Sequence, residues 1–196
     1  MTERGFSNVS IESAHAFRAI MHAMARPGRI QPLAPGLAAP HPLLTSAAAV
    51  ALTLFDFQTT IWLSPELRSE AVERYLRFHA GSPITADAGK AQFVLATAGT
   101  MQLDPALLMQ GTHEYPDRSA TLVLQVPGFG GEMVELTGPG LRGSLAFGAE
   151  GLDVAFWAAM AANHARFPTG IDVIFAAPGA VAALPRSTAI RLLEAA

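Results

Sequence analysis

The sequence contains no cysteine and a single lysine, Lys90, among its 196 residues. Without cysteine the chain has no disulfide, no thiolate nucleophile and no cysteine-ligated metal site. Pyridoxal phosphate is held as a Schiff base by a lysine, so Lys90 is the one residue in the sequence that could hold this cofactor. Lys90 follows Asp87-Ala88-Gly89 in an expected loop just before a strand, and no neighbouring motif supports such a site. The sequence therefore predicts no bound cofactor.

Charged residues are also scarce, at 15% of the chain against about 25% in typical soluble domains. Two interpretations stay open: a subunit that buries much of its surface against partners, or an alanine-rich composition that raises the apolar share to 51%. The formal net charge of −3 argues against nucleic-acid binding, which favours a basic face. No uninterrupted apolar run is long enough to span a membrane, and residues 1–10 lack a signal-peptide core. We therefore expect a cytoplasmic protein without membrane contact.

The order of apolar runs and breakers predicts an α/β fold. Helices are expected over residues 11–24, the first half of 46–57, 64–78, a short stretch from Asp104, and 152–163. Strands are expected over residues 59–63, 91–96, 121–126, 133–137, the run after Pro168 and Gly170, and 180–184, with 121–126 and 133–137 paired as a hairpin. Residues 31–42 are expected to form an extended loop, and 189–196 could be helix or strand. The prediction is one domain, residues 1–196, with a mixed sheet in a three-layer α/β/α arrangement.

Two helices carry specific expectations about their buried faces. Helical spacing in the first places on one face Phe17, Ile20, Met21 and Met24. The helix over 64–78 is expected to be capped by Ser64 and to turn inward Leu67, Ala71, Tyr75 and Phe78.

No motif indicates metal binding or hydrolytic catalysis. The six histidines form no H-x-H or H-E-x-x-H pair, and there is no G-x-S-x-G elbow. Residues 138–143, Gly-Pro-Gly-Leu-Arg-Gly, could expose amides to a phosphate, but they match neither a dinucleotide loop nor a Walker loop. A turn is the simpler interpretation, and we expect no metal site.

Arginine supplies nearly all of the positive charge, and several arginines fall at expected element ends, beside proline or glycine or at a helix C-terminus. These are Arg26, Arg29, Arg77, Arg142 and Arg186. Element ends are where anion sites form, but they are also where arginine caps helix carbonyls. From these and a neighbouring histidine, the candidate phosphate-type ligands are Arg26, Arg77, His79 and Arg186. Capping is the simpler interpretation for each arginine taken singly, and no catalytic residue can be named.

Several segments, in order along almost the whole chain, together resemble one family. They are FRAIMHAMARPG (17–28), ALTLFD (51–56), IWLS (61–64), LRFHAGSP (76–83), ATLVLQV (120–126), LTGPG (136–140), FPTGID (167–172) and LPRST (184–188). The ordered set is similar to the PhnH family, which belongs to the bacterial carbon–phosphorus lyase system of phosphonate metabolism.

This resemblance implies a fold like the large domain of pyridoxal-phosphate transferases, without that cofactor's site. It also implies a homodimer that assembles with the G, I and J subunits. With the G, I and L proteins, a member of this family supports formation of alpha-D-ribose 1-methylphosphonate 5-triphosphate from ATP and methylphosphonate. The family assigns the nucleosidase chemistry to the I subunit, so the resemblance implies an accessory role. The alternative is a subunit that itself binds a phosphate, phosphonate or nucleotide anion through the arginines above.

Overall fold

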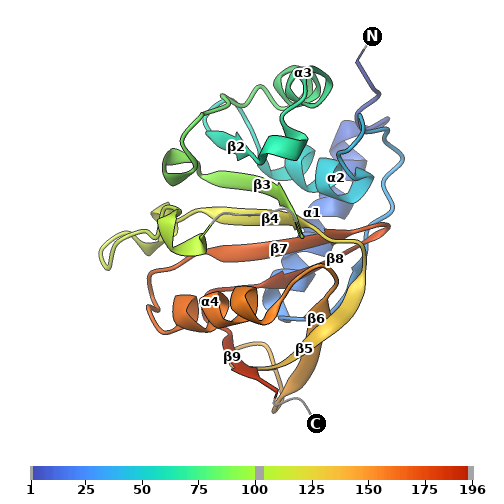
Figure 1. The fold of residues 1–196 in the computed structure, drawn as a ribbon. Coiled ribbons are helices and arrows are strands. Elements are labelled where there is room, and N and C mark those ends of the chain that lie inside the picture. Colours follow the sequence, from blue (N-terminus) through green and yellow to red (C-terminus); the bar gives the residue numbers. More distant parts are fainter. Residues whose placement is uncertain (1, 100–103, 194–196) are drawn as a thin grey trace.

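A six-stranded mixed sheet forms the centre of the computed structural model, which describes residues 2–99 and 104–193 (Figure 1). Its strands, in spatial order, are β1 (Gln31–Pro32), β8 (Ala180–Leu184), β7 (Asp172–Ala177), β4 (Thr121–Gln125), β3 (Phe93–Thr97) and β2 (Ile61–Leu63). The neighbours β2, β3, β4 and β7 run parallel, whereas β8 and β1 are antiparallel to their neighbours. The sheet is therefore of mixed direction, as the sequence predicts.

A second, smaller sheet is entirely antiparallel. It contains β6 (Leu145–Ala149), β5 (Phe129–Thr137) and β9 (Ala189–Leu192), with β5 in the middle. The strand β9 resolves the open choice for the C-terminal segment in favour of a strand. Residues 194–196 lie outside the described part of the chain.

Helices and the small sheet cover the two faces of the central sheet and bury separate cores (Figure 1). One face carries α1 (Val9–Ala25) and α2 (Thr45–Leu54), with α3 (Glu70–His79) packed beside α2 near the β2 edge. The other face is covered by α4 (Val154–His164) and the small sheet, and its core centres on Trp157, Phe147 and Phe175. This arrangement confirms the α/β class and the layered architecture; the likeness to pyridoxal-phosphate transferases stays a prediction.

The predicted hairpin between residues 121–126 and 133–137 is wrong. β4 is already paired on both sides, with β3 and with β7, and three of its side chains, Leu122, Val123 and Leu124, are fully buried. β5 instead leaves the central sheet and pairs with β6 and β9. Its ladder with β6 is irregular between Phe129 and Met133, around glycines with positive φ at 130 and 131.

The expected inward faces of two helices are only partly right. In α1 the buried residues are Ala16, Ile20 and Ala23, whereas Phe17 is 48% exposed and Met21 is 54% exposed. The small alanines let α1 lie close to α2 and β8, and the larger side chains are left outside.

In α3, Tyr75 is buried as expected, but Phe78 is 72% exposed. The expected single helix over 64–78 is also divided into a 3-10 turn, η1 (Pro65–Leu67), and α3. Ser64 makes no side-chain cap hydrogen bond; Ser69 caps α3 by accepting from the amide of Val72. No helix in the described ranges has the length and apolar character needed to cross a membrane.

Candidate functional site

Three surface hollows meet at the C-terminal end of α1. The first lies along the outward face of α1, the second is lined by Arg186, and the third lies between the end of α1 and the β5–β6 loop. They are contiguous, because Ala25 lines the first two, Arg26 lines the first and third, and Gly140 lines the second and third. This part of the surface is therefore the strongest candidate for contact with a partner or ligand.

The hollow along α1 is an apolar groove of about 510 Å³. Its lining residues are Ala14, Phe17, Arg18, Met21, His22, Ala25 and Arg26. Positions 14, 17, 18, 21, 22 and 25 are three or four apart, so they form one stripe of the helix. We call the surface formed by these seven lining residues the α1 outer face. It combines exposed large apolar side chains with arginine at its margin, a composition typical of protein–protein interfaces.

The hollow lined by Arg186 contains an arginine that is already engaged by the protein. Arg186 Nε donates to Asp172 Oδ1 at 3.1 Å, and its backbone amide donates to the same oxygen at 2.8 Å. Its terminal nitrogens donate to Asp172 Oδ2 and to the Pro116 carbonyl oxygen. His164 Nδ1 lies 3.1 Å from the Arg186 carbonyl oxygen. Arg186 thus joins the end of β8 to the start of β7 and to η4 (Pro116–Arg118).

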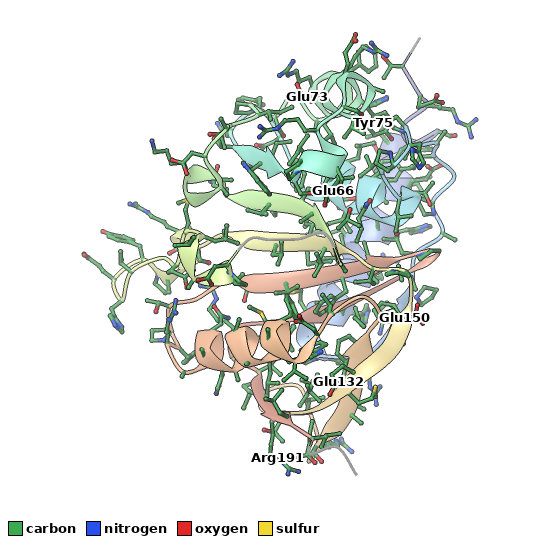
Figure 2. All side chains as sticks on the ribbon, viewed as in Figure 1. Glu66, Glu73, Tyr75, Glu132, Glu150 and Arg191 are labelled. Carbon is green, nitrogen blue, oxygen red and sulfur yellow. The ribbon has the colours of Figure 1, made fainter. Side chains whose placement is uncertain are left out.

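Arg77 and His79 lie on α3, near the β2 edge of the sheet (Figure 1), whereas Arg26 precedes β1, the strand at the opposite edge. Figure 2 shows Glu73, the ion-pair partner of Arg77 at 3.0 Å, on this helix. His79 Nε2 lies 2.9 Å from the Glu3 carbonyl oxygen, which ties the N-terminal segment to α3. The structure therefore does not bring the four expected anion ligands together.

Tyr75 lies at the centre of the α3 contacts. Its ring lies 4.6 Å from that of His79, and its hydroxyl is buried without a hydrogen-bond partner among the described residues. Burial raises the pKa of the Tyr75 phenol to about 12, and the Glu3 carboxylate adds to this shift. A neutral, desolvated phenol of this kind points to packing rather than to proton transfer.

The third hollow gathers three of the five arginines at element ends: Arg26, Arg29 and Arg142. It has a volume of about 550 Å³, and its other lining residues are Gly140, Leu141, Ser144 and Leu145. We call it the arginine hollow. Arg29 and Arg142 were not among the ligands expected from sequence. Their common signal was a position beside a Gly or Pro turn, in Arg-Pro-Gly-Arg (26–29) and Gly-Leu-Arg-Gly (140–143).

The carboxyl ends of the parallel strands are where open α/β sheets usually bind ligands. Here Gln125, only 3% exposed, fills the end of β4. Its Oε1 accepts from the Leu44 amide at 2.6 Å, and its Nε2 donates to the Pro42 carbonyl at 3.3 Å and to Thr97 Oγ1 at 3.1 Å. Gln125 therefore joins β4 to β3 and to the start of α2 at this edge.

Lys90 ends the 3-10 turn η2 (Ala88–Lys90), at the amino end of β3, with Nζ 3.5 Å from Asp87 Oδ2. It thus lies at the amino ends of the parallel strands, away from the carboxyl ends where ligands usually bind. Among residues 2–99 and 104–193, no three histidine, aspartate or glutamate side chains are grouped so that they could hold a metal ion.

Comparison with known proteins connects the sequence of this chain to one family. The family model described as "Bacterial phosphonate metabolism protein (PhnH)" matches residues 4–191. A Rhizobium meliloti (strain 1021) protein, named alpha-D-ribose 1-methylphosphonate 5-triphosphate synthase subunit PhnH, is 38% identical over 184 residues, or 93% of this chain and 92% of the relative. A Stutzerimonas stutzeri protein, named "Putative C-P lyase subunit protein HtxG", is 34% identical over 184 residues, or 90% of this chain and 85% of the relative. The chain belongs to the PhnH family of bacterial phosphonate metabolism proteins.

Proposed function

We propose that the protein is an accessory subunit of the carbon–phosphorus lyase system and has no catalytic residues of its own. In this role it acts with the G, I and L proteins when alpha-D-ribose 1-methylphosphonate 5-triphosphate is formed from ATP and methylphosphonate. Its relatives' names, as a synthase subunit and a C-P lyase subunit, support the pathway. The structural observation that carries the accessory role is the α1 outer face. Its exposed apolar side chains and arginines are suited to binding another protein and not to catalysing a reaction.

Apolar side chains left in water on the α1 outer face favour association with another protein. Phe17 and Met21 are one helical turn apart and about half exposed, and they lie beside the charged Arg18 and Arg26. Burying apolar surface contributes a gross gain of about 25 cal/mol per Å², from which the entropy and desolvation costs of association are subtracted. Phenylalanine, methionine and arginine are also enriched at interfaces relative to other surfaces. The α1 outer face is therefore the proposed contact with the other subunits of the assembly.

We place the G, I and J subunits as the partners in the core complex, with the protein as a homodimer when alone and in the cytoplasm. We also treat residues 1–196 as one domain, since the two hydrophobic cores pack on opposite faces of the same central sheet. The low share of charged residues, 15%, supports a chain that buries part of its surface.

Copurification tests the proposed contact. The protein is co-expressed with the G, I and J subunits, and the complex is isolated through a tag on one of those three. We expect Phe17→Ser combined with Met21→Ser to lower the recovered amount at least tenfold, while Phe57→Ser, on another surface and 74% exposed, leaves it unchanged. Undiminished recovery of the double variant would place the contact elsewhere. Sedimentation of the isolated chain tests the homodimer, and a monomer at micromolar concentration would refute it.

A second candidate function is anion binding by the subunit itself. Of the four ligands expected from sequence, Arg186 and Arg77 already pair with Asp172 and Glu73. Arg26 is better placed for an anion, because it lines the arginine hollow together with two further arginines.

A further inference from the structure

The arginine hollow concentrates positive charge without a matching acid. Its lining contains Arg26, Arg29 and Arg142 and no aspartate or glutamate. None of these arginines forms an ion pair with a carboxylate of the described residues. By contrast, Arg74, Arg77, Arg186 and Arg191 each pair with an acid. Arginine stays charged at any physiological pH, so three cations line this hollow.

Glu135, a carboxylate hydrogen-bonded to the lining residue Ser144, is already paired with an arginine outside the hollow. Glu135 accepts a hydrogen bond from Ser144 and pairs with Arg191, whose terminal nitrogen lies 2.6 Å from Glu135 Oε2. Hydrogen bonds from Arg191 and then Ser144 hold the pKa of Glu135 below its usual value, so this group is fully ionised and paired. Figure 2 shows Arg191 at the end of the molecule opposite α3. The three lining arginines therefore keep their net positive charge.

The surrounding backbone holds the two sides of the hollow together. Gly140, with φ +85°, lies so close to α1 that an added Cβ would be 2.3 Å from the Ala25 carbonyl oxygen. Gly28, with φ +72°, packs similarly against Leu136, Leu145 and Phe147. Its amide donates to the Ala183 carbonyl at 3.0 Å. The loop carrying Arg142 and the turn carrying Arg26 and Arg29 thus pack against each other. This packing fixes the backbone positions of the three arginines.

We propose that Arg26, Arg29 and Arg142 form a binding site for a small polyanion of the oligophosphate class. Guanidinium groups present paired donors that match phosphate oxygens, and three of them match a chain of phosphates better than a single carboxylate. The volume of about 550 Å³ accommodates a triphosphate and leaves room for a group attached to it. The site rests on the second candidate function, anion binding by the subunit itself, and names its location and ligand class. It does not depend on the accessory role, because binding needs only the folded chain.

Calorimetric titration of the isolated protein tests the site at low and at physiological ionic strength. The probes are inorganic triphosphate, ATP and orthophosphate. We expect triphosphate to bind more tightly than orthophosphate and to weaken as salt is added, because exposed charges are screened. Arg29→Gln and Arg142→Gln should each weaken triphosphate binding by about tenfold or more, since each removes a charge-assisted hydrogen bond.

Arg74→Gln is the matched control, because it removes the same charge from an exposed arginine on α3 and should leave binding unchanged. If Arg142→Gln fails to fold, Arg29→Gln and the charge-retaining Arg142→Lys take its place. Equal affinity for triphosphate and ATP would show that the site recognises the phosphates alone. Tighter binding of ATP would show that the site also contacts the nucleoside. No binding, or equal weakening by Arg74→Gln, would overturn the proposal. Copurification with the other subunits is a separate measurement. Failure of the anion site in the titration therefore does not imply failure of the subunit contact, and the reverse also holds.

Discussion

Replacing Gly140 by alanine tests how the β5–β6 loop docks on the end of α1. Alanine at this φ of +85° carries the left-handed strain of about 1 kcal/mol. Its Cβ would also lie 2.3 Å from the Ala25 carbonyl oxygen and 3.0 Å from Pro27 Cδ. Backbone cannot move aside as a flexible side chain can, so we add an overpacking cost of about 1–3 kcal/mol. The expected loss of unfolding free energy is therefore about 2–4 kcal/mol.

Gly143→Ala is the matched control for that substitution. Gly143 has nearly the same φ, +81°, but an added Cβ would meet nothing within 4 Å. We therefore expect a loss of about 1 kcal/mol, from backbone strain alone. Urea unfolding followed by circular dichroism measures the loss of unfolding free energy in each variant. In a thermal melt, each kcal/mol lost should lower the Tm of a chain of this size by about 2–4 °C. Equal losses for the two variants would refute the close approach of this loop to α1, and with it the fixed geometry of the arginine hollow.

Further predictions concern the ion pair at the end of β8 and the core beside α3. Arg186→Ala should lower the free energy of unfolding by about 3 kcal/mol, because it leaves the largely buried Asp172 unpaired. Arg77→Ala, which breaks an exposed pair with Glu73, should cost less than about 1 kcal/mol in the same urea titration, and equal losses would contradict the distinction. Since the pKa of Tyr75 is about 12 when folded and about 10 when unfolded, the unfolded state loses this proton first as pH rises. Stability should therefore fall between about pH 10 and 12, and Tyr75→Phe should reduce that fall; an identical pH profile for the variant would refute the assignment.

Much of the fold follows from local signals in the sequence. Asp104 caps the 3-10 turn η3 (Pro105–Leu107), as its side chain and the following proline predict. The β-branched and apolar run after Gly170 forms the buried strand β7, and the turn at Pro178 and Gly179 leads directly to β8. These features depend on residues close in the chain, which is why they could be predicted.

The errors arose where distant segments decide the outcome. A short glycine-rich turn after β4 favours a hairpin locally, but β3 and β7 already occupy both sides of β4. In α1, hydrophobic spacing favours Phe17 and Met21 as core residues, whereas close packing selects the smaller Ala16 and Ala23. The sequence also could not show that Arg29 and Arg142 line one hollow, because they lie on segments over a hundred residues apart.

The most direct test of the accessory role is the release of adenine, which ATP must lose from its ribose when methylphosphonate becomes attached there. The assay uses the protein reconstituted with the G, I and L proteins, comparing wild type, the Phe17→Ser/Met21→Ser variant and the Phe57→Ser control. We expect the double variant to lose most activity at low protein concentration and to regain it as its concentration is raised, because weakened association is overcome by mass action. Loss of activity that persists at saturating concentration would contradict an accessory subunit that acts through the α1 outer face.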